Sequence, residues 1–448
     1  MDPGIGDLRG DVLIDSGRIV KVAEHVSDDS ATIVELDGAV VIPGLIDTHV
    51  HLWQEPLGGL ASSCWGREYF GVVHPLSGRY RPSDMYTATY GGALQMLTKG
   101  VTTVFDFCHA TNSPEHAAAS LRGLDDAGIR AVFGFCFRHR PEAQIAGFET
   151  LEDRRVVLEA LHATWKTHDR VRIGVALNNI DHVSPEIHQQ ELLTARDLGM
   201  VASIHSNLAG QVSVTDDLGL LGSDLLWVHA GEITDEELSL LGRHGGAVVC
   251  TPEIEVAQMA VTPVANRAVR HGVPVGFGTD VPAAFNGDMI TQLRIANVLM
   301  RADDGRRQRA SGRPGVREAD NPLAGSADLL KMATAGSAEI LGLADEIGSI
   351  TPGKKADLVV IGTQPWGLAA ATPTDYVLFR ATSRNIERVY VGGRLVVSDG
   401  VPVDADLAAL RADLDETREW VLGIHAASPW EPIDAAAQAR YERGQGKA

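Results

Sequence analysis

Two histidines separated by one residue, His49 and His51, follow the apolar run at residues 40–42 and the breaking pair Pro43-Gly44. In an extended strand the side chains alternate between two faces, so both imidazoles point the same way. Two imidazoles on one face at the end of a strand can bind a metal ion. A lone pair of this kind is weak support for a site, so its weight depends on ligands elsewhere in the chain.

Three further residues of this chemical type each close a short apolar segment. His205 ends MVASIH, His229 ends LLWVH and Asp280 ends PVGFGTD. Folds built on a parallel barrel carry their catalytic residues at the carboxyl ends of the strands. We therefore expect these residues to meet at one end of a barrel.

The order of helix, short turn and apolar strand repeats along the chain and predicts the elements that position them. Helices are expected at residues 84–98, 114–127, 150–167 and 185–198, and similar segments follow. Eight strands begin with the one at Leu45 and continue at residues 101–107, 129–137, 171–177, 200–205, 225–229, 247–250 and 274–278. This pattern predicts an α/β fold, a closed (β/α)8 TIM barrel over residues 45–344.

Short β segments flank the barrel. Residues 11–14, 18–22 and 32–36 have the composition of strands, and residues 389–397 with Gly392-Gly393 predict a hairpin. We expect a small β-sandwich built from residues 1–44 and 345–404. The tail at residues 405–448 should be helical to residue 422 and solvated from residue 430.

Two connections lack a clear pattern. Residues 55–80 are rich in aromatic side chains, which suits either a lid over a flat ligand or ordinary loop packing. Residues 301–320 are charged and poor in apolar residues, which predicts a mobile surface loop.

Composition excludes several classes of protein. A net charge of -20 argues against nucleic acid or an anionic membrane as a partner, because either requires a basic face. No apolar run approaches the roughly 18 residues of a membrane span, and the N-terminus has no signal pattern. The four cysteines show no paired spacing, so we expect them to be reduced, in a cytoplasmic protein.

The motifs PGLIDTHVH, SIH, WVHAG and GFGTD, followed by KKADLVV, occur in an order that resembles the amidohydrolase superfamily. Within it, the chain is most similar to the branch of cytosine and guanine deaminases and triazine hydrolases. The resemblance covers almost the whole chain. It implies one more strand ahead of Asp2-Pro3-Gly4, so either the start was placed late or the sandwich lacks an edge strand.

The resemblance also implies a metal site. We assign His49, His51, His205 and Asp280 as its ligands, a set that suits Zn²⁺, with Fe²⁺ as the alternative, and leaves a position open for water. Relatives with two metals use a lysine from the fourth strand. Residues 171–177 are followed by Asn178-Asn179, so we expect a single ion.

Proton transfer is where the chain departs from the resembled enzymes. Asp280 should take the proton of the attacking water, and His229 should polarise the substrate beside the metal. Deaminases of this branch carry a glutamate three residues after the fifth-strand histidine, where this chain has Leu208. Glu232, Glu253 and Glu255 are candidates for its role, and Glu253 is our choice.

Several polar residues near the expected strand ends are candidates for substrate contact. They are Trp53 and Gln54 after the first strand, His109 after the second, Asn178 after the fourth and Asn207 after the fifth. Trp53 and His229 also have purely structural alternatives, as packing or core residues.

The leading hypothesis is a mononuclear metal hydrolase that cleaves a C–N bond of a small nitrogen heterocycle, by deamination or a related hydrolysis. A metal-dependent lyase or decarboxylase on the same barrel is the first alternative, and a binding protein without catalysis is the second. Relatives are often dimers or larger, so we also expect a homo-oligomer.

Overall fold

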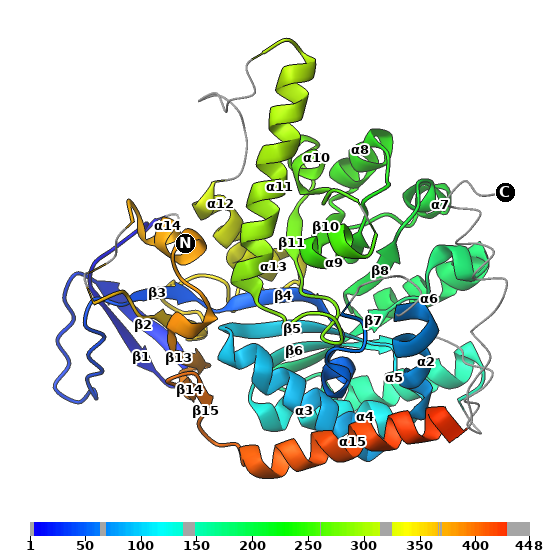
Figure 1. Ribbon diagram of the computed structural model, residues 1–448, viewed down its shortest axis with the longest axis horizontal. Helices are drawn as coiled ribbons and strands as arrows, with labels where there is room; N and C mark the ends of the chain where they lie inside the picture. Colours follow the sequence, from blue (N-terminus) through cyan, green and yellow to red (C-terminus); the bar gives the residue numbers. More distant parts are fainter. Residues whose placement is uncertain are drawn as a thin grey trace.

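An eight-stranded parallel sheet forms the body of the molecule (Figure 1). The computed structural model describes residues 4–62, 69–137, 148–259, 261–313, 325–365, 367 and 370–427. The strands pair in chain order, and the sheet closes where Val50 of the first strand bridges Asp280, just beyond the last. They are β4 (Leu45–Val50), β5 (Val101–Cys108), β6 (Arg130–Cys136), β7 (Val171–Ala176), β8 (Ala202–Ser206), β9 (Leu225–His229), β10 (Ala247–Cys250) and β11 (Val275–Phe277). The predicted barrel is confirmed.

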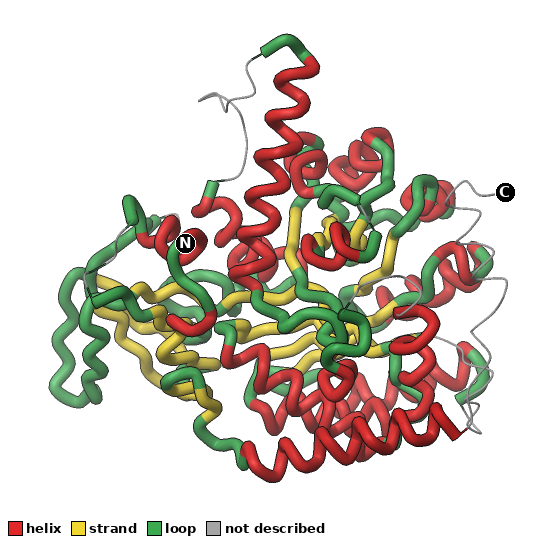
Figure 2. The backbone as a smooth tube through the Cα atoms, viewed as in Figure 1, coloured by secondary structure: helices red, strands yellow, loops and turns green. Residues whose placement is uncertain are grey.

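The strands are apolar runs because both of their faces are covered. Every residue of β4 and β5 is buried, since side chains fill the barrel and helices pack on its outside. Figure 2 shows helices around the yellow strands. These helices are α3 (Pro82–Thr98), α4 (Pro114–Ala127), α5 (Leu151–Trp165), α6 (Pro185–Asp197), α7 (Gln211–Asp217), α8 (Asp235–His244), α9 (Pro252–Ala257), α10 (Ala265–Arg270), α11 (Met289–Ala310), α12 (Ser326–Lys331), the π-helix η6 (Met332–Gly336) and α13 (Ser337–Ile340).

The helix ends follow from local sequence. Thr150 begins α5 with a capping box, in which its hydroxyl accepts a hydrogen bond from the Asp153 N–H and the Asp153 carboxylate accepts one from the Thr150 N–H. Gly128 ends α4 in the left-handed conformation, with φ of 76°, which glycine adopts without a steric penalty. Both ends agree with the predicted helix boundaries within about one residue.

Two antiparallel sheets lie beside the barrel and take strands from both ends of the chain. β1 (Asp11–Asp15) pairs with β2 (Arg18–Ala23), and β3 (Val40–Pro43), β12 (Leu358–Ile361), β13 (Ile386–Val391), β14 (Arg394–Ser398) and β15 (Val401–Pro402) form the five-stranded sheet. The strand predicted at residues 32–36 is wrong. Ile33 is 78% exposed and Val34 is 47% exposed, so this segment buries no apolar face. The next strand along the chain is β3, which pairs with β12.

The small sheet meets the barrel through a buried ion pair. The Arg130 guanidinium on β6 donates from Nε to Asp357 Oδ2 (2.8 Å) and from Nη2 to Asp357 Oδ1 (3.2 Å). Asp357 also accepts from the Gly392 N–H, and its carbonyl accepts from the Gly44 N–H. One aspartate therefore joins the barrel, the hairpin and the start of β4.

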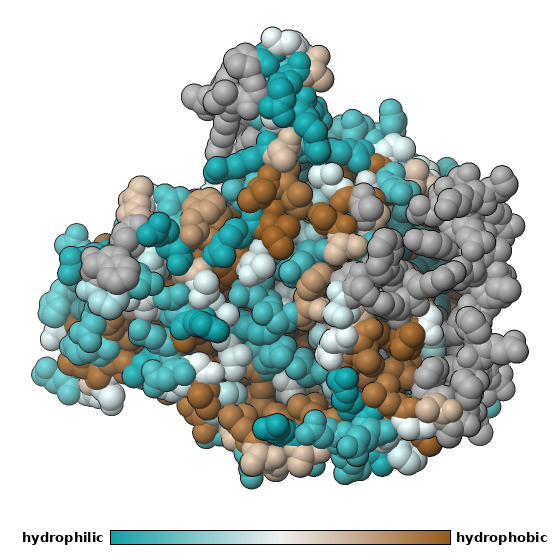
Figure 3. Space-filling model, viewed as in Figure 1, coloured by the Kyte–Doolittle hydropathy of each residue, from teal (hydrophilic) through white to brown (hydrophobic). Residues whose placement is uncertain are grey.

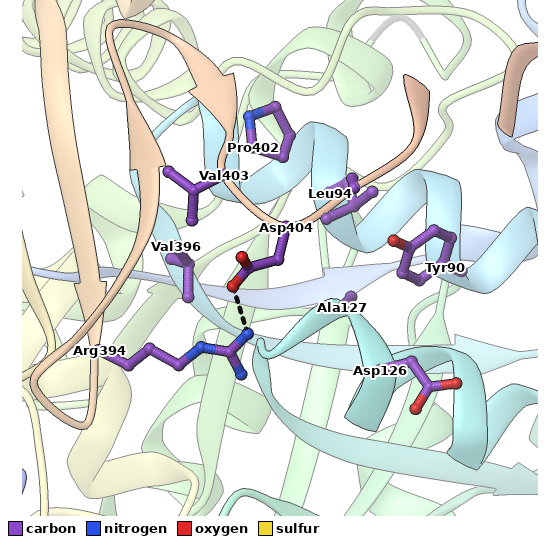
Figure 4. A pocket seen from close by; sticks show the side chains of 10 residues that line it. Tyr90, Leu94, Asp126, Ala127, Arg394, Val396, Pro402, Val403 and Asp404 are labelled. Atoms are coloured by element: carbon purple, nitrogen blue, oxygen red, sulfur yellow. Dashed lines mark hydrogen bonds and ion pairs between the residues drawn. The ribbon is translucent and has the colours of Figure 1, made fainter. Parts of the chain in front are cut away.

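A small cavity lies farther along the same junction (Figure 4). It is lined by residues of α3, α4, β14, β15 and the segment after β15, and the exposed Arg394–Asp404 pair stands at its edge (2.6 Å). Its volume is about 20 Å³, which is room for about one water molecule. None of the predicted site residues lines it.

Both connections without a clear pattern contain helices, which corrects the loop predicted at residues 301–320 and leaves the two alternatives for residues 55–80 open. Residues 55–80 contain short helical turns, η1 (Leu52–Leu57), η2 (Tyr69–Val73), α2 (His74–Leu76) and η3 (Ser77–Arg79), whose apolar side chains are largely buried; residues 63–68 lie outside the described part. Residues 301–310 belong to α11, where Gln308 donates to the Asp304 carboxylate one turn earlier. Figure 3 shows the outer end of α11 as hydrophilic, which explains why its composition resembled a loop. Residues 314–320 and 430–448 are not among those described.

Two further observations bear on the class of protein. None of the helices within the described ranges combines the length and the apolar character that crossing a membrane demands. Cys108, Cys136 and Cys250 are buried and form no disulfide within the described part of the chain, and Cys64 falls outside the described residues.

The predicted C-terminal helix is present as α15 (Leu407–Ala427), which runs along α3 and the segment after β4 (Figure 1). Thr417 and Val421 are buried beneath it. Arg418 donates from Nη1 to the carbonyls of Pro56 (3.2 Å) and Gly58 (3.1 Å). The tail therefore fixes the segment that carries Trp53 and Gln54.

Replacing Arg418 with methionine should lower the free energy of unfolding by about 1–2 kcal/mol, because two carbonyls lose a charged donor while the apolar stem is kept. Urea denaturation followed by circular dichroism measures the change. Arg411→Met is the matched control, since Arg411 is an exposed residue of the same helix. Equal loss in both variants would show that the Arg418 contacts contribute nothing specific.

Candidate metal centre

Four side chains from three distant parts of the chain converge at the carboxyl end of the barrel. His49 and His51 come from β4 and the residue after it, His205 from β8, and Asp280 from the turn after β11, and their ligand atoms all lie within 4.8 Å of one another. Nε2 of His49 is 3.2 Å and Nε2 of His51 is 3.1 Å from Asp280 Oδ1. The sequence prediction named these four residues as one set.

The donor chemistry of this cluster fits a divalent cation. Nδ1 of His51 donates to the Phe107 carbonyl (2.7 Å), so in the neutral ring Nε2 is a lone pair that faces a carboxylate oxygen. Two acceptors at this distance repel one another unless a cation lies between them. A backbone carbonyl that fixes the ring in this way is the usual support of a metal-binding histidine. Nδ1 of His49 is also buried without a hydrogen-bond partner in the described part of the chain.

The charge states agree with this donor set. Burial lowers the pKa of His49 to about 4. Burial and the neighbouring imidazoles hold the pKa of His205 well below its ordinary value. Burial alone would raise the pKa of Asp280, but its contacts with His49 and His51 and the charge of His229 keep that pKa well below the usual range. Neutral imidazoles and an ionised carboxylate are the forms that bind a metal.

Two buried carboxylates support the backbone that carries the ligands. Asp47 accepts hydrogen bonds from the Thr279 hydroxyl (2.6 Å) and from the His49 N–H (3.0 Å), and this ties β4 to the end of β11. Asp106 accepts from the Leu52 N–H (3.1 Å). Burial raises the pKa of each carboxyl to about 7. Both groups act behind the cluster and are not among its four ligands.

His229 lies beside the cluster. Its Nε2 is 3.8 Å from Asp280 Oδ2, its Nδ1 is 2.9 Å from the Thr251 hydroxyl, and Nδ1 is also 3.7 Å from Glu255 Oε1. Burial would lower the pKa of His229, but Glu255 and Asp280 raise it above the ordinary value. The backbone is in the left-handed region at His229 (φ 68°) and at Ala230 (φ 52°), a conformation that non-glycine residues hold only where neighbouring contacts fix it.

With this geometry defined, comparison with known proteins identifies the family. Residues 40–396 match the amidohydrolase family, which is most of the chain. The chain belongs to the amidohydrolase family. The predicted resemblance is confirmed at this level.

Named relatives of this amidohydrolase include 5-methylthioadenosine/S-adenosylhomocysteine deaminases from several organisms. The protein from Nitratidesulfovibrio vulgaris (Miyazaki F) is 27% identical over 440 residues, covering 94% of this chain and 93% of the relative. The protein from Symbiobacterium thermophilum is 30% identical over 420 residues, covering 87% and 89%. This coverage means that the similarity includes the small sheets as well as the barrel.

Solved structures support the fold. An adenosine deaminase from Xanthomonas campestris with bound zinc aligns with a TM-score of 0.78 at 23% identity, over 92% of this chain and 93% of that one. An atrazine chlorohydrolase from Arthrobacter aurescens TC1, complexed with zinc, aligns with a TM-score of 0.75 at 22% identity, over 91% and 94%. The barrel with its small sheets is therefore the arrangement found in both.

Of the predicted substrate contacts, His109 packs against the cluster and Trp53 packs against His109. The His109 ring is 4.3 Å from the His51 ring, and the Trp53 ring is 6.3 Å from that of His109, between centroids. Gln54 follows Trp53 and donates from Nε2 to the Tyr69 hydroxyl (3.0 Å), while its Oε1 is buried without a partner in the described ranges. The segment after β4 thus brings polar atoms to the mouth of the barrel.

The two asparagines are held by neighbouring helices. The side-chain amide of Asn178 donates to the carboxylate of Glu191 on α6, and its N–H donates to the same group (3.1 Å). The N–H of Asn207 donates to Gln211 Oε1 (2.8 Å). Within the described residues, no hydrogen bond or ion pair joins either asparagine to the four ligands. Their role in substrate contact stays a prediction.

The candidate acids occupy different surroundings. Glu253 is half-buried and accepts from Gln292 Nε2 on α11 (2.7 Å), Glu255 is fully buried against His229, and Glu232 is exposed. The sequence did not single out Thr251 or Thr279, although Thr279 lies inside the GFGTD motif. For both residues, the available signal was a hydroxyl side chain close in sequence to a candidate acid or to a predicted ligand.

Proposed function

We propose that this amidohydrolase hydrolyses a C–N bond of a small nitrogen heterocycle, with His49, His51, His205 and Asp280 holding one divalent metal ion, Zn²⁺ before Fe²⁺. The observation that carries the proposal is the set of three imidazoles and one carboxylate whose ligand atoms lie within 4.8 Å of one another. An ion bound there would supply Lewis acidity and lower the pKa of a water molecule toward neutrality.

The roles of the protein groups follow from their places around that set. Asp280 has a second carboxylate oxygen, Oδ2, on the side of His229, and it would accept the proton of the attacking water. His229 would contact the substrate through its Nε2 atom, which faces the side of the cluster. The proposed substrate contacts are Trp53, Gln54, His109, Asn178 and Asn207, with Glu253 as a proton carrier.

The names of the relatives suggest the first substrates to test. Named relatives act on methylthioadenosine, S-adenosylhomocysteine and 5′-deoxyadenosine, and the aligned structures include an adenosine deaminase and an atrazine chlorohydrolase. We propose an amino-substituted purine or triazine ring as the substrate class. Leu208, in place of the acid of the resembled deaminases, keeps displacement of another leaving group as the second candidate.

A panel of methylthioadenosine, S-adenosylhomocysteine, 5′-deoxyadenosine, adenosine and atrazine should yield one substrate that releases ammonia or chloride in the zinc-loaded protein. In ¹⁸O-labelled water the product should carry one ¹⁸O at the carbon that lost its substituent, because water is the nucleophile. Mass spectrometry measures the label. Turnover without label would favour a lyase or decarboxylase, and metal binding with no turnover of any compound would favour a binding protein.

We also propose that the protein acts in the cytoplasm as a homo-oligomer on a small molecule, without a nucleic acid or membrane partner. The buried thiols of Cys108 and Cys250, which form no disulfide within the described residues, support a reducing compartment. Light scattering on a size-exclusion column measures the assembly directly, and a monomer would contradict that part.

A further inference from the structure

Glu255 is a fully buried carboxylate that the proposed reaction does not yet use. It lies on α9, directly after β10, and its Oε1 accepts from the Thr251 N–H (2.7 Å). Its other oxygen, Oε2, is buried with no hydrogen-bond partner in the part of the chain that the structure describes. Burying a carboxylate with half of its acceptor capacity unused is costly, so a compensating neighbour is needed.

A purely structural role accounts for only part of this arrangement. Oε1 caps the first turn of α9, as acids at helix N-termini often do. A cap needs no burial, however, since Asp153 makes the same contact at the start of α5 in an exposed setting. A further neighbour of the Glu255 carboxylate is Nδ1 of His229, 3.7 Å from Oε1.

The two ring nitrogens of His229 make different contacts. Nδ1 faces Thr251 Oγ1 at 2.9 Å and the Glu255 carboxylate, while Nε2 faces Asp280 Oδ2 at 3.8 Å. A carboxylate on the Nδ1 side favours the tautomer that carries its proton on Nδ1, which leaves the Nε2 lone pair on the side of the cluster. The left-handed backbone of His229 needs such contacts to fix the ring.

We infer that Glu255, through Thr251 and the Nδ1 atom, is the positioning residue that holds His229 in the orientation and tautomer in which Nε2 faces the substrate. The reference to a substrate rests on the proposed function; the tautomer is a property of the chain itself. Glu253 cannot exchange roles with Glu255. Residues two apart on a helix are rotated by about 200° around its axis, so they lie on nearly opposite faces, and Glu253 contacts Gln292 on α11.

The tautomer is tested in the zinc-loaded protein labelled with ¹⁵N-histidine, where side-chain nitrogen shifts distinguish a protonated from an unprotonated ring nitrogen. The His229→Gln variant assigns the signal. We expect the proton on Nδ1 in the wild type, a shift of the population toward Nε2 in Glu255→Gln, and an intermediate result in Glu255→Asp. Thr251→Val, which keeps the shape of the side chain, should move the population in the same direction as Glu255→Gln.

Kinetics give the second readout. With methylthioadenosine as the substrate, Glu255→Gln should lower kcat about 100-fold and change KM less than about threefold, and Glu255→Asp should recover part of the loss. Asp153→Asn is the control, because Asp153 makes the matching helix-capping contact at the start of α5; its kcat should stay within about twofold of the wild type.

The two outcomes that overturn the inference are a wild-type His229 tautomer in Glu255→Gln and a kcat within about twofold of the wild type. A wild-type protein that hydrolyses no compound of the panel contradicts the proposed function alone, because the tautomer measurement needs no turnover. If Glu255→Gln does not fold, Thr251→Val decides the question by the same two measurements.

Discussion

Substituting alanine for Asp280 is expected to abolish metal binding and to lower kcat/KM by about 10⁴-fold or more. The effect is large because one side chain has two proposed functions. Its Oδ1 is shared between His49 and His51, so without it the ligand set loses its single negative charge. The same carboxylate would accept the proton of the attacking water, and a lost general base alone costs about 10² to 10⁴ in rate.

Metal content by inductively coupled plasma mass spectrometry and steady-state kinetics measure the two effects separately. His205→Ala should behave in the same way, because it removes one of the three imidazoles of the proposed ligand set. Asp288→Asn is the matched control: Asp288 is a buried aspartate nearby that caps α11 through the Thr291 N–H, and asparagine caps equally well. An Asp280→Ala protein that kept its metal and its activity would end the ligand assignment.

The barrel and its ligand set could be predicted because each strand is an apolar run and each ligand ends one. Burial on both faces removes polar residues from the strands, so a histidine or aspartate at the strand end is conspicuous. His205 and Asp280, 75 residues apart in the sequence, stand out by this contrast, and the resemblance to the amidohydrolase superfamily then joined them in one ligand set. Closure of the barrel then brings the carboxyl ends of the strands together, and the prediction of eight strands in a closed barrel already implies this.

The errors in predicted secondary structure came from segments whose composition suggests one structure while their surroundings favour another. Residues 32–36 have the residues of a strand but no partner to pair with, so Ile33 stays exposed. Residues 301–310 have the composition of a loop, yet they continue α11 into solvent, where a charged helix needs no apolar face. Pattern reasoning reads local sequence, and in both cases the deciding factor was what lies next to the segment.

The choice between Glu253 and Glu255 shows the finer limit. Sequence placed both acids after β10, but the face that each presents depends on the residue at which α9 begins. A change of one position in that start rotates every side chain by about 100°. Only with α9 fixed at Pro252–Ala257 does Glu255 face His229 and Glu253 face α11.

Replacing Asp357 with asparagine is expected to lower the free energy of unfolding by about 3–5 kcal/mol, because it leaves the Arg130 guanidinium buried without its counter-charge. Arg130 is 2% exposed and Asp357 is 5% exposed, and asparagine still offers an oxygen to the Gly392 N–H, so the change is mainly one of charge. Urea denaturation followed by circular dichroism measures it. Asp404→Asn removes the partner of an exposed arginine at the same junction and should cost less than about 1 kcal/mol. Similar losses in the two variants would mean that burial does not set the value of the Arg130–Asp357 pair.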